Sequence, residues 1–167
     1  MKTPTLLCLL AASIALTTAA SAQVYKFVVP LEGNQEVPSG DPDGSGLAVL
    51  FIDSGALTID WSITLENVDL PIFAAHIHNA PAGVNGPVRV NFSGQLSGSD
   101  LFDADLAGVL ANPSAWYVNV HNAAHPGGAV RGQLTEGYVV PESSTVLGGV
   151  GVVALVAGAY WRRRMTR

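Results

Sequence analysis

The histidines of this chain are gathered in two short segments. His76 and His78 lie in the first segment, and His121 and His125 lie in the second. If the first segment is an extended strand, His76 and His78 point to the same side of it about 7 Å apart, because side chains alternate along a strand. Two imidazoles so placed can share one metal ion, and Zn²⁺ and Cu²⁺ are well suited to imidazole nitrogen. The pattern predicts a candidate metal site at His76, His78 and His121.

A structural role is the competing interpretation of these histidines. Each imidazole would then bond a carbonyl or carboxylate group of its own hairpin and hold a turn in shape. We expect His76 and His78 on one face. We do not expect convergence of all three imidazoles with His121, since a metal site also needs acceptor groups that orient each ring. A metal-dependent redox enzyme built on the His-x-His pair, as in copper-zinc superoxide dismutase, is the minor alternative.

Other reaction chemistry finds little support in the residues. The single cysteine, Cys8, lies in an apolar N-terminal segment, so the rest of the chain has no thiolate nucleophile, thiolate metal site or disulfide. No Gly-x-Ser-x-Gly motif is present, which excludes the serine-hydrolase elbow. Asp41 and Asp43 have the spacing that opens a calcium loop, but the twelfth position is Ile52 instead of glutamate. An EF-hand is excluded, and an irregular calcium site is a weaker alternative to a polar turn.

Charge and hydropathy divide the chain into three parts. Apolar residues are concentrated in segments 6–20 and 146–161, and removing both leaves roughly 115 residues, enough for one domain. Residues 23–137 carry three basic side chains and twelve carboxylates, a net charge of −9. A surface of this sign repels nucleic acid, so a nucleic-acid-binding protein is excluded.

The middle part has the pattern of an all-β domain. Short apolar or alternating runs, bounded by Gly, Pro, Asn or Asp, are typical of an antiparallel β-sandwich or barrel. The expected strands are residues 25–29, 46–52, 56–65, 74–78, 88–92, 116–121 and 129–134. Strict alternation through 57–65 predicts that Trp61 lies in the core. One short helix is expected at 100–110, where apolar residues form a stripe after Ser99 or Asp100 as the cap.

Two segments of the domain echo each other. The segments that begin at His78 and His121 both read His-Asn-Ala, then a short spacer, then Gly-x-Val-Arg ending at Arg89 or Arg131. We infer two related hairpins, with His78 near Arg89 and His121 near Arg131.

Three ordered blocks of the chain resemble the CHRD domain, first described in chordin and frequent in bacterial secreted proteins. The blocks are residues 31–38, residues 75–78 with 83–88, and residues 116–121 with 126–134. The resemblance implies an immunoglobulin-like β-barrel rather than a particular activity. The chain departs from the usual pattern at Ala129, where the family often has an acidic residue, and at Asn122, where it often has threonine.

The N-terminal part has the pattern of a secretory signal peptide. Lys2 supplies a positive charge, residues 6–16 form an apolar run, and Ala20-Ser21-Ala22 provides small residues for cleavage. We expect signal peptidase to remove residues 1–22 and the domain to occupy residues 23–138.

The C-terminal part, residues 139–167, resembles the PEP-CTERM sorting signal of Gram-negative bacteria. Its features are the motif Val140, Pro141 and Glu142, an expected transmembrane helix at 146–161, and the basic tail 162–167 with Arg162, Arg163 and Arg164. Ser143 stands where the family often has a second proline. The resemblance implies recognition by an exosortase-type sorting enzyme, and the basic tail is expected to stay cytoplasmic.

Together these patterns predict an exported protein of the cell envelope or extracellular surface. We expect a non-catalytic binding or structural module, with extracellular polysaccharide or matrix as its partner and a C-terminal membrane anchor. The alternative is a Zn²⁺- or Cu²⁺-binding protein or metal-dependent redox enzyme. We also expect the folded core to end near Gly137 and the residues from Val140 onward to add nothing to its stability.

Overall fold

The structure is a computed structural model that describes residues 21–141, most of which lie in strands or the turns between them. The strands are β1 (Val24–Glu32), β2 (Ser45–Asp53), β3 (Thr58–Glu66), β4 (Ile72–Asn79), β5 (Val88–Asn91), β6 (Ser97–Phe102), β7 (Trp116–Asn122), β8 (Val130–Gln133) and β9 (Tyr138–Val140). One α-helix, α1 (Leu106–Ala111), and two 3-10 helices, η1 (Gly33–Gln35) and η2 (Pro113–Ala115), complete this part of the chain. The expected all-β class with one short helix is confirmed.

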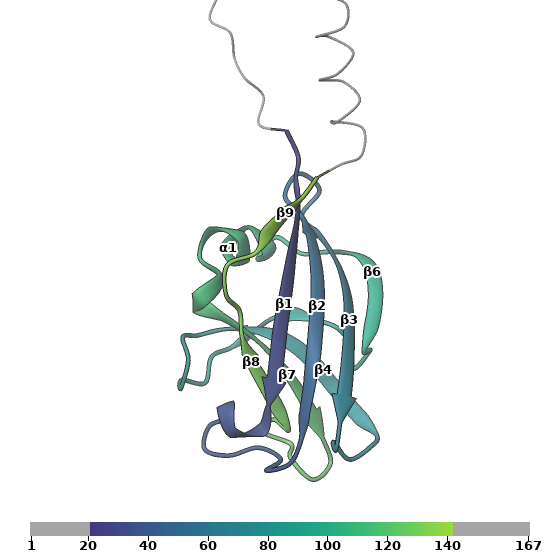
Figure 1. The fold of residues 1–167 in the computed structure, drawn as a ribbon, viewed down its shortest axis with the longest axis vertical. Coiled ribbons are helices and arrows are strands. Elements are labelled where there is room, and N and C mark those ends of the chain that lie inside the picture. The colour runs from purple at the N-terminus through teal and green to yellow at the C-terminus, as the bar shows by residue number, and fades with distance from the viewer. Residues whose placement is uncertain (1–20, 142–167) are drawn as a thin grey trace, which may run out of the picture.

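The strands form one antiparallel sheet that curls on itself. Their order is β5-β4-β7-β8-β1-β2-β3-β6, and β9 pairs with β1. In Figure 1, β1, β2 and β3 pass in front of β4 and β7. Alternate apolar side chains from both parts of the sheet meet in a single core, which includes Leu50, Ile52, Ile59, Ile77, Val118 and Val120. The curl therefore buries one face of every long strand.

The outer face of the sheet is also covered around β7. All seven residues of β7 are buried, although only every second side chain can point into the apolar core. Val118 and Val120 belong to that core, so Tyr117, Asn119 and His121 point to the other face. A polar layer thus lies on the outside of the sheet at β7.

The expected helix at 100–110 is only partly correct. Residues 97–102 form β6 and pair with β3, with Leu101 opposite Ile59. The helix begins only at Leu106, after the Asp103 carboxylate accepts a hydrogen bond from the Asp105 N–H at 2.9 Å. Sheet pairing with β3 has overridden the helical stripe in the first half of the segment.

Trp61 is less buried than its alternation predicts. Ile59 and Ile63 of the same face are buried, whereas Trp61 is partly buried and packs against the edge of the core. Its ring stacks on Phe92 with centroids 4.5 Å apart, and its Nε1–H donates to the Gln95 carbonyl at 3.0 Å.

The sheet continues beyond the expected end of the core at Gly137. In β9, Tyr138, Val139 and Val140 pair with Lys26, Tyr25 and Val24 of β1. Val140 is therefore part of a strand, and the two ends of the described chain lie side by side. Figure 1 shows them leaving the sheet at the same end.

The expected terminal signals fall mainly outside the described residues. Of the sorting motif, Val140 and Pro141 are described, whereas Glu142, the helix expected at 146–161, and Arg162, Arg163 and Arg164 are not. Most of the expected signal peptide is likewise outside them. Within residues 21–141, no helix has both the length and the apolar character needed to cross a membrane.

Candidate metal centre

The register of β4 and β7 brings three of the histidines together. His76 pairs with Asn119, and His78 pairs with Tyr117. Directly opposed residues of an antiparallel ladder point to the same face. His76 and His78 therefore share one face of the sheet, as expected. His121, two residues beyond Asn119 on β7, lies on the same outer face.

The three imidazoles converge, so the expectation that they would not is wrong. One nitrogen from each of His76, His78 and His121 lies within 4.8 Å of the other two. The ring centroids are 5.5 Å apart for His76 and His78, 5.2 Å for His76 and His121, and 6.0 Å for His78 and His121. Ligand nitrogens of one zinc ion lie at most about 4.2 Å apart, since each bond is about 2.1 Å. A small side-chain movement would therefore close the cluster around an ion.

Two of the rings are also held by loop carbonyls. His78 Nδ1 is 3.0 Å from the Gly86 carbonyl oxygen, and His121 Nδ1 is 3.1 Å from the Pro126 carbonyl oxygen. A carbonyl only accepts, so each Nδ1 carries the proton and each neutral ring presents its Nε2 lone pair. The expected structural bonds within each hairpin are present, and they orient the rings as outer acceptors orient metal-binding histidines.

Each of the three rings has a buried nitrogen without a hydrogen-bond partner. In residues 21–141, five buried side-chain nitrogen or oxygen atoms are unpartnered, and three of them are His76 Nδ1, His78 Nε2 and His121 Nε2. Buried polar atoms without partners are rare in folded proteins. Three of them belong to one cluster of histidines.

The surroundings favour neutral imidazoles. Burial, together with the nearby His121 and His78 rings, lowers the pKa of His76 to about 4. Burial also lowers the pKa of His78 and of His121, although their bonds to Gly86 and Pro126 act in the opposite direction. Neutral imidazole is the form that binds a metal ion.

The fourth histidine lies apart from this cluster. His125 lies in the loop after β7, and its Nε2 is 3.9 Å from an Asp41 carboxylate oxygen. Within the described residues, neither Asp41 nor Asp43 belongs to a cluster of three or more histidine, cysteine or carboxylate side chains that could hold a metal ion.

Comparison of the sequence with models of known protein families identifies one family for this domain. A family model described as the CHRD domain matches residues 27–134. This chain belongs to the CHRD family. The match includes His76, His78 and His121 and runs from β1 to the end of β8. No curated protein and no solved structure matches the chain.

Beside the histidines, this CHRD domain places Tyr117, which the sequence did not single out, together with Arg131. Tyr117 stacks on His78 with centroids 4.8 Å apart, and the Arg131 guanidinium lies 3.4 Å from the centroid of the Tyr117 ring. Arg131 lies opposite Asn119 on β7, two residues from His121. The expected pairing of His78 with Arg89 is not found. Arg89 is exposed and lies 4.0 Å from Asp105 instead. Residues 117, 119 and 121 are two apart in the sequence, and this spacing could have predicted that Tyr117 shares a face of β7 with His121.

Arg131 connects the histidine cluster to the loop before β5. It is 1% exposed, and its guanidinium donates to the carbonyl oxygens of Pro81 and Val84, both at 3.0 Å. The same loop contains Gly86, whose carbonyl oxygen orients His78. Arg131 is therefore a support for the loop that positions a candidate ligand.

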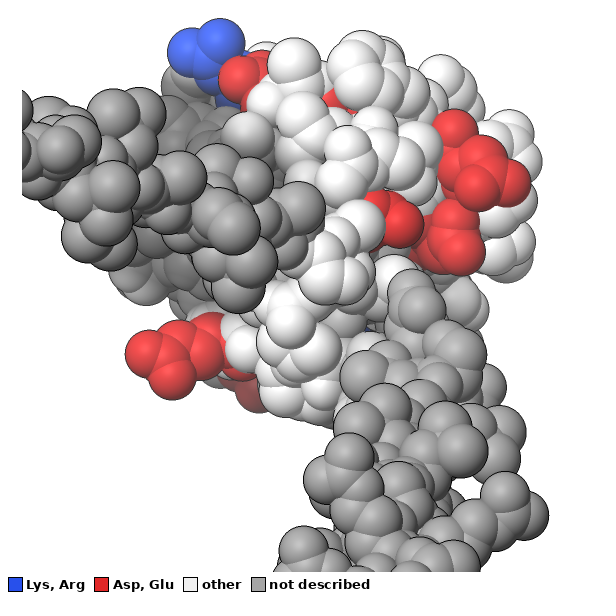
Figure 2. Space-filling view, turned by 90° about the horizontal axis from the view of Figure 1, so that it is seen from above, with Lys and Arg blue, Asp and Glu red and all other residues white. Residues whose placement is uncertain are grey.

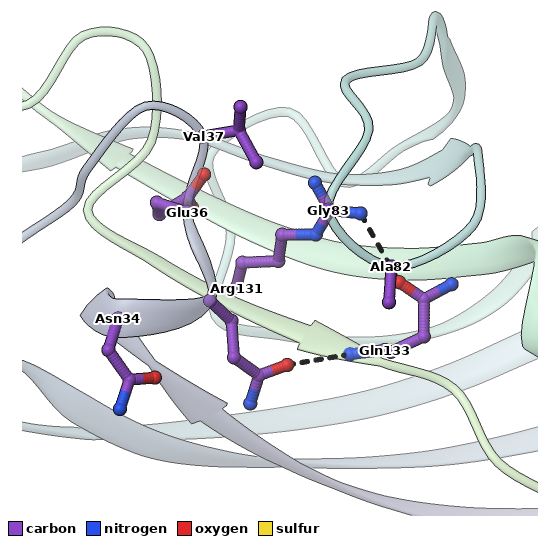
Figure 3. A pocket seen from close by; sticks show the side chains of 8 residues that line it. Asn34, Glu36, Val37, Ala82, Gly83, Arg131 and Gln133 are labelled. Atoms are coloured by element: carbon purple, nitrogen blue, oxygen red, sulfur yellow. Dashed lines mark hydrogen bonds between the residues drawn. The ribbon is translucent and has the colours of Figure 1, made fainter.

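A cavity adjoins this support. It has a volume of about 250 Å³ and is lined by Asn34, Glu36 and Val37 after β1, by Ala82 and Gly83, and by Arg131. Figure 3 shows the Arg131 side chain reaching toward Gly83. Glu36 is 6% exposed, and burial raises the pKa of its carboxyl to about 7, against the opposing effects of Arg131, Asn119 and the Val37 N–H.

The domain presents mainly negative charge to solvent. Figure 2 shows carboxylates at several places on one face of the described chain and little basic charge. Such a field raises the local concentration of cations.

Proposed function

We propose that this CHRD protein binds a transition-metal ion, Zn²⁺ or Cu²⁺, through His76, His78 and His121. The observation that carries the proposal is that one nitrogen from each of the three imidazoles lies within 4.8 Å of the other two, on rings that each have a buried nitrogen without a hydrogen-bond partner. Imidazole nitrogen suits both ions, and the set contains no sulfur or carboxylate ligand. The bonds of His78 and His121 to loop carbonyls support the proposal, because they leave the Nε2 lone pairs free for the ion.

The proposed setting is the cell envelope of a Gram-negative bacterium. Support comes from the signal-peptide pattern of residues 1–22 and from the likeness of Val140 to Arg164 to a PEP-CTERM signal. In this setting the protein would be exported, sorted by an exosortase-type enzyme and displayed near extracellular matrix. The immunoglobulin-like barrel implied by the CHRD resemblance is part of the same proposal.

Metal titration of the full-length chain, purified without a histidine tag and stripped with a chelator, tests the site. We expect one equivalent of Zn²⁺ or Cu²⁺ to bind by isothermal titration calorimetry. His76→Ala and His121→Ala should each weaken binding at least about 100-fold, because losing a group that only orients a ligand already costs about 10- to 100-fold. At an ion concentration 100 times Kd, binding should stabilise the fold by about 2.7 kcal/mol and raise the thermal midpoint accordingly.

His125→Ala is the matched control, because His125 belongs to the same hairpin as His121 but not to the converging cluster. This variant should keep full stoichiometry and affinity. Absence of binding by the unmodified chain, or an equal loss in His125→Ala and His121→Ala, would overturn the proposal.

A further inference from the structure

The proposed metal site does not account for two other buried oxygen atoms on the same side of the sheet. Asn119 Oδ1 and Glu36 Oε1 lack a hydrogen-bond partner. Asn119 is 2% exposed and Glu36 is 6% exposed. These two oxygens and the three imidazole nitrogens make up all the unpartnered buried side-chain atoms found in residues 21–141. Their concentration in one place suggests a common cause.

Asn119 lies in the middle of the histidine cluster. It is directly opposite His76, it is two residues from His121 on β7, and it is diagonal to His78, whose partner is Tyr117. Opposed side chains in a sheet start about 5 Å apart, and diagonal ones about 7 to 8 Å. All three imidazoles therefore start from positions next to Asn119 on one face of the sheet.

The Asn119 amide is turned so that its oxygen faces away from the Glu36 carboxylate. Asn119 Nδ2 donates to Glu36 Oε2 at 3.5 Å. The Nε2 atoms of His78 and His121 present lone pairs, because the protons of these rings are on Nδ1. Neither ring can therefore donate to Asn119 Oδ1 through Nε2, although this buried oxygen requires a donor.

Building on the proposed function, we propose that a metal ion held by the three histidines keeps a bound water molecule, and that Asn119 Oδ1 accepts a hydrogen bond from that water. Glu36 is the positioning residue that holds the amide by accepting from Nδ2. Three protein ligands and one water are the arrangement of an open metal site rather than a closed structural one. Small anions that bind metals can then replace the water.

Azide binding to the Co²⁺-loaded full-length chain, followed by visible absorption, tests this arrangement. The nitrogen that azide presents to the metal carries no hydrogen, so azide gains nothing from Asn119, whereas the water it displaces does. Asn119→Leu should therefore raise azide affinity about fivefold, the factor that a typical net hydrogen bond contributes. Asn119→Asp, which has nearly the shape of asparagine, keeps an acceptor and adds negative charge, so it should weaken azide binding at least about threefold.

Asn91→Leu is the matched control. Asn91 lies opposite His76 on the other side, in β5, but its Oδ1 already accepts from the Ser93 N–H at 2.7 Å. Azide affinity in this variant should equal that of the unmodified chain.

The outcomes separate the two proposals. If the unmodified chain fails to bind Co²⁺, the metal site itself is wrong. If Co²⁺ binds but azide affinity is the same in Asn119→Leu, Asn119→Asp and the unmodified chain, the water contact is wrong and the metal site stands. A loss of Co²⁺ affinity above about 100-fold in Asn119→Leu, with Asn119→Asp retaining it, exceeds what a group outside the ligand set costs, so it would make Asn119 a direct ligand and overturn the water contact.

Discussion

Tyr117 fixes the His78 ring directly by stacking and indirectly through Gly86. Its ring stacks on the imidazole with an interplanar angle of 10°, and its hydroxyl oxygen accepts the Gly86 N–H at 3.2 Å. The Gly86 carbonyl oxygen in turn accepts the His78 Nδ1–H. These three residues form a closed set of contacts, so the ring is oriented before any ion arrives. Preorganisation of this kind lowers the entropy lost on binding.

The Glu36 carboxyl should make stability depend on pH. Its pKa is about 7 in the folded protein and about 4.5 when unfolded, so the folded state holds the proton more tightly. Its stabilising contribution is complete below the unfolded pKa and disappears as pH rises through about 7. Glu36→Gln removes this dependence. In chelator, the thermal midpoint of Glu36→Gln minus that of the unmodified protein should increase from pH 5 to pH 7.5.

The difference between the two thermal midpoints measures the effect of Glu36 ionisation alone, because the histidines contribute equally to the stability of both proteins. A difference that is constant across this range would show that Glu36 ionises normally in the folded protein.

At the scale of elements, the segment 33–44 covers the outer face beside the site and depends on Gly33. The Gly33 N–H donates to the Gly44 carbonyl oxygen, and the Gly33 carbonyl oxygen accepts the Gly40 N–H. A Cβ at Gly33 would overlap the carbonyl oxygen of Asp41. Gly33→Ala should therefore lower the free energy of unfolding by at least about 2 kcal/mol, in the range for overpacking. Urea denaturation measures this change.

Gly127→Ala is the control for that substitution, since a Cβ at Gly127 meets nothing within 4 Å. Equal stabilities of the two variants would contradict the close packing of the 33–44 segment.

Trp61 links β3 to the segment before β6. Because it is partly buried and stacks on Phe92, we expect Trp61→Ala to cost about 3 kcal/mol, the low end of the range for buried aromatic residues. Trp61→Phe, which keeps a stacking ring but loses the bond to Gln95, should cost less. A cost below about 1 kcal/mol for Trp61→Ala in urea denaturation would mean that the ring packs loosely.

Alternation along single strands predicted much of the sheet and part of the site. It located seven strands and placed His76 and His78 on one face. It did not reveal that His121 joins them, because the approach depends on the register between β4 and β7, which shifts between Ile72 and Ala74. The bonds to Gly86 and Pro126 depend on how two loops fold back, and periodicity carries no information about that. Glu36 gave no signal, since it reaches the site from a turn.

At the scale of the whole molecule, β9 changes what the C-terminal boundary should be. A chain ending at Gly137 loses three residue pairs with β1 and the Tyr138 ring, which lies 5.8 Å from Lys26 Nζ. We expect this truncation to lower the thermal midpoint by about 5 °C relative to a chain ending at Pro141, equivalent to about 1 kcal/mol. Equal midpoints in a calorimetric comparison would restore the boundary expected from the sequence.

The pairing of Val24 with Val140 also determines how the domain would respond to tension. A force pulling Gln23 and Pro141 apart would act on the β1–β9 ladder from its open end, so its hydrogen bonds would break one after another. The β1–β2 ladder has nine residue pairs, against three for β1–β9. Pulling should therefore release β9 at low force as the first mechanical event, while the histidine cluster on β4 and β7 remains folded.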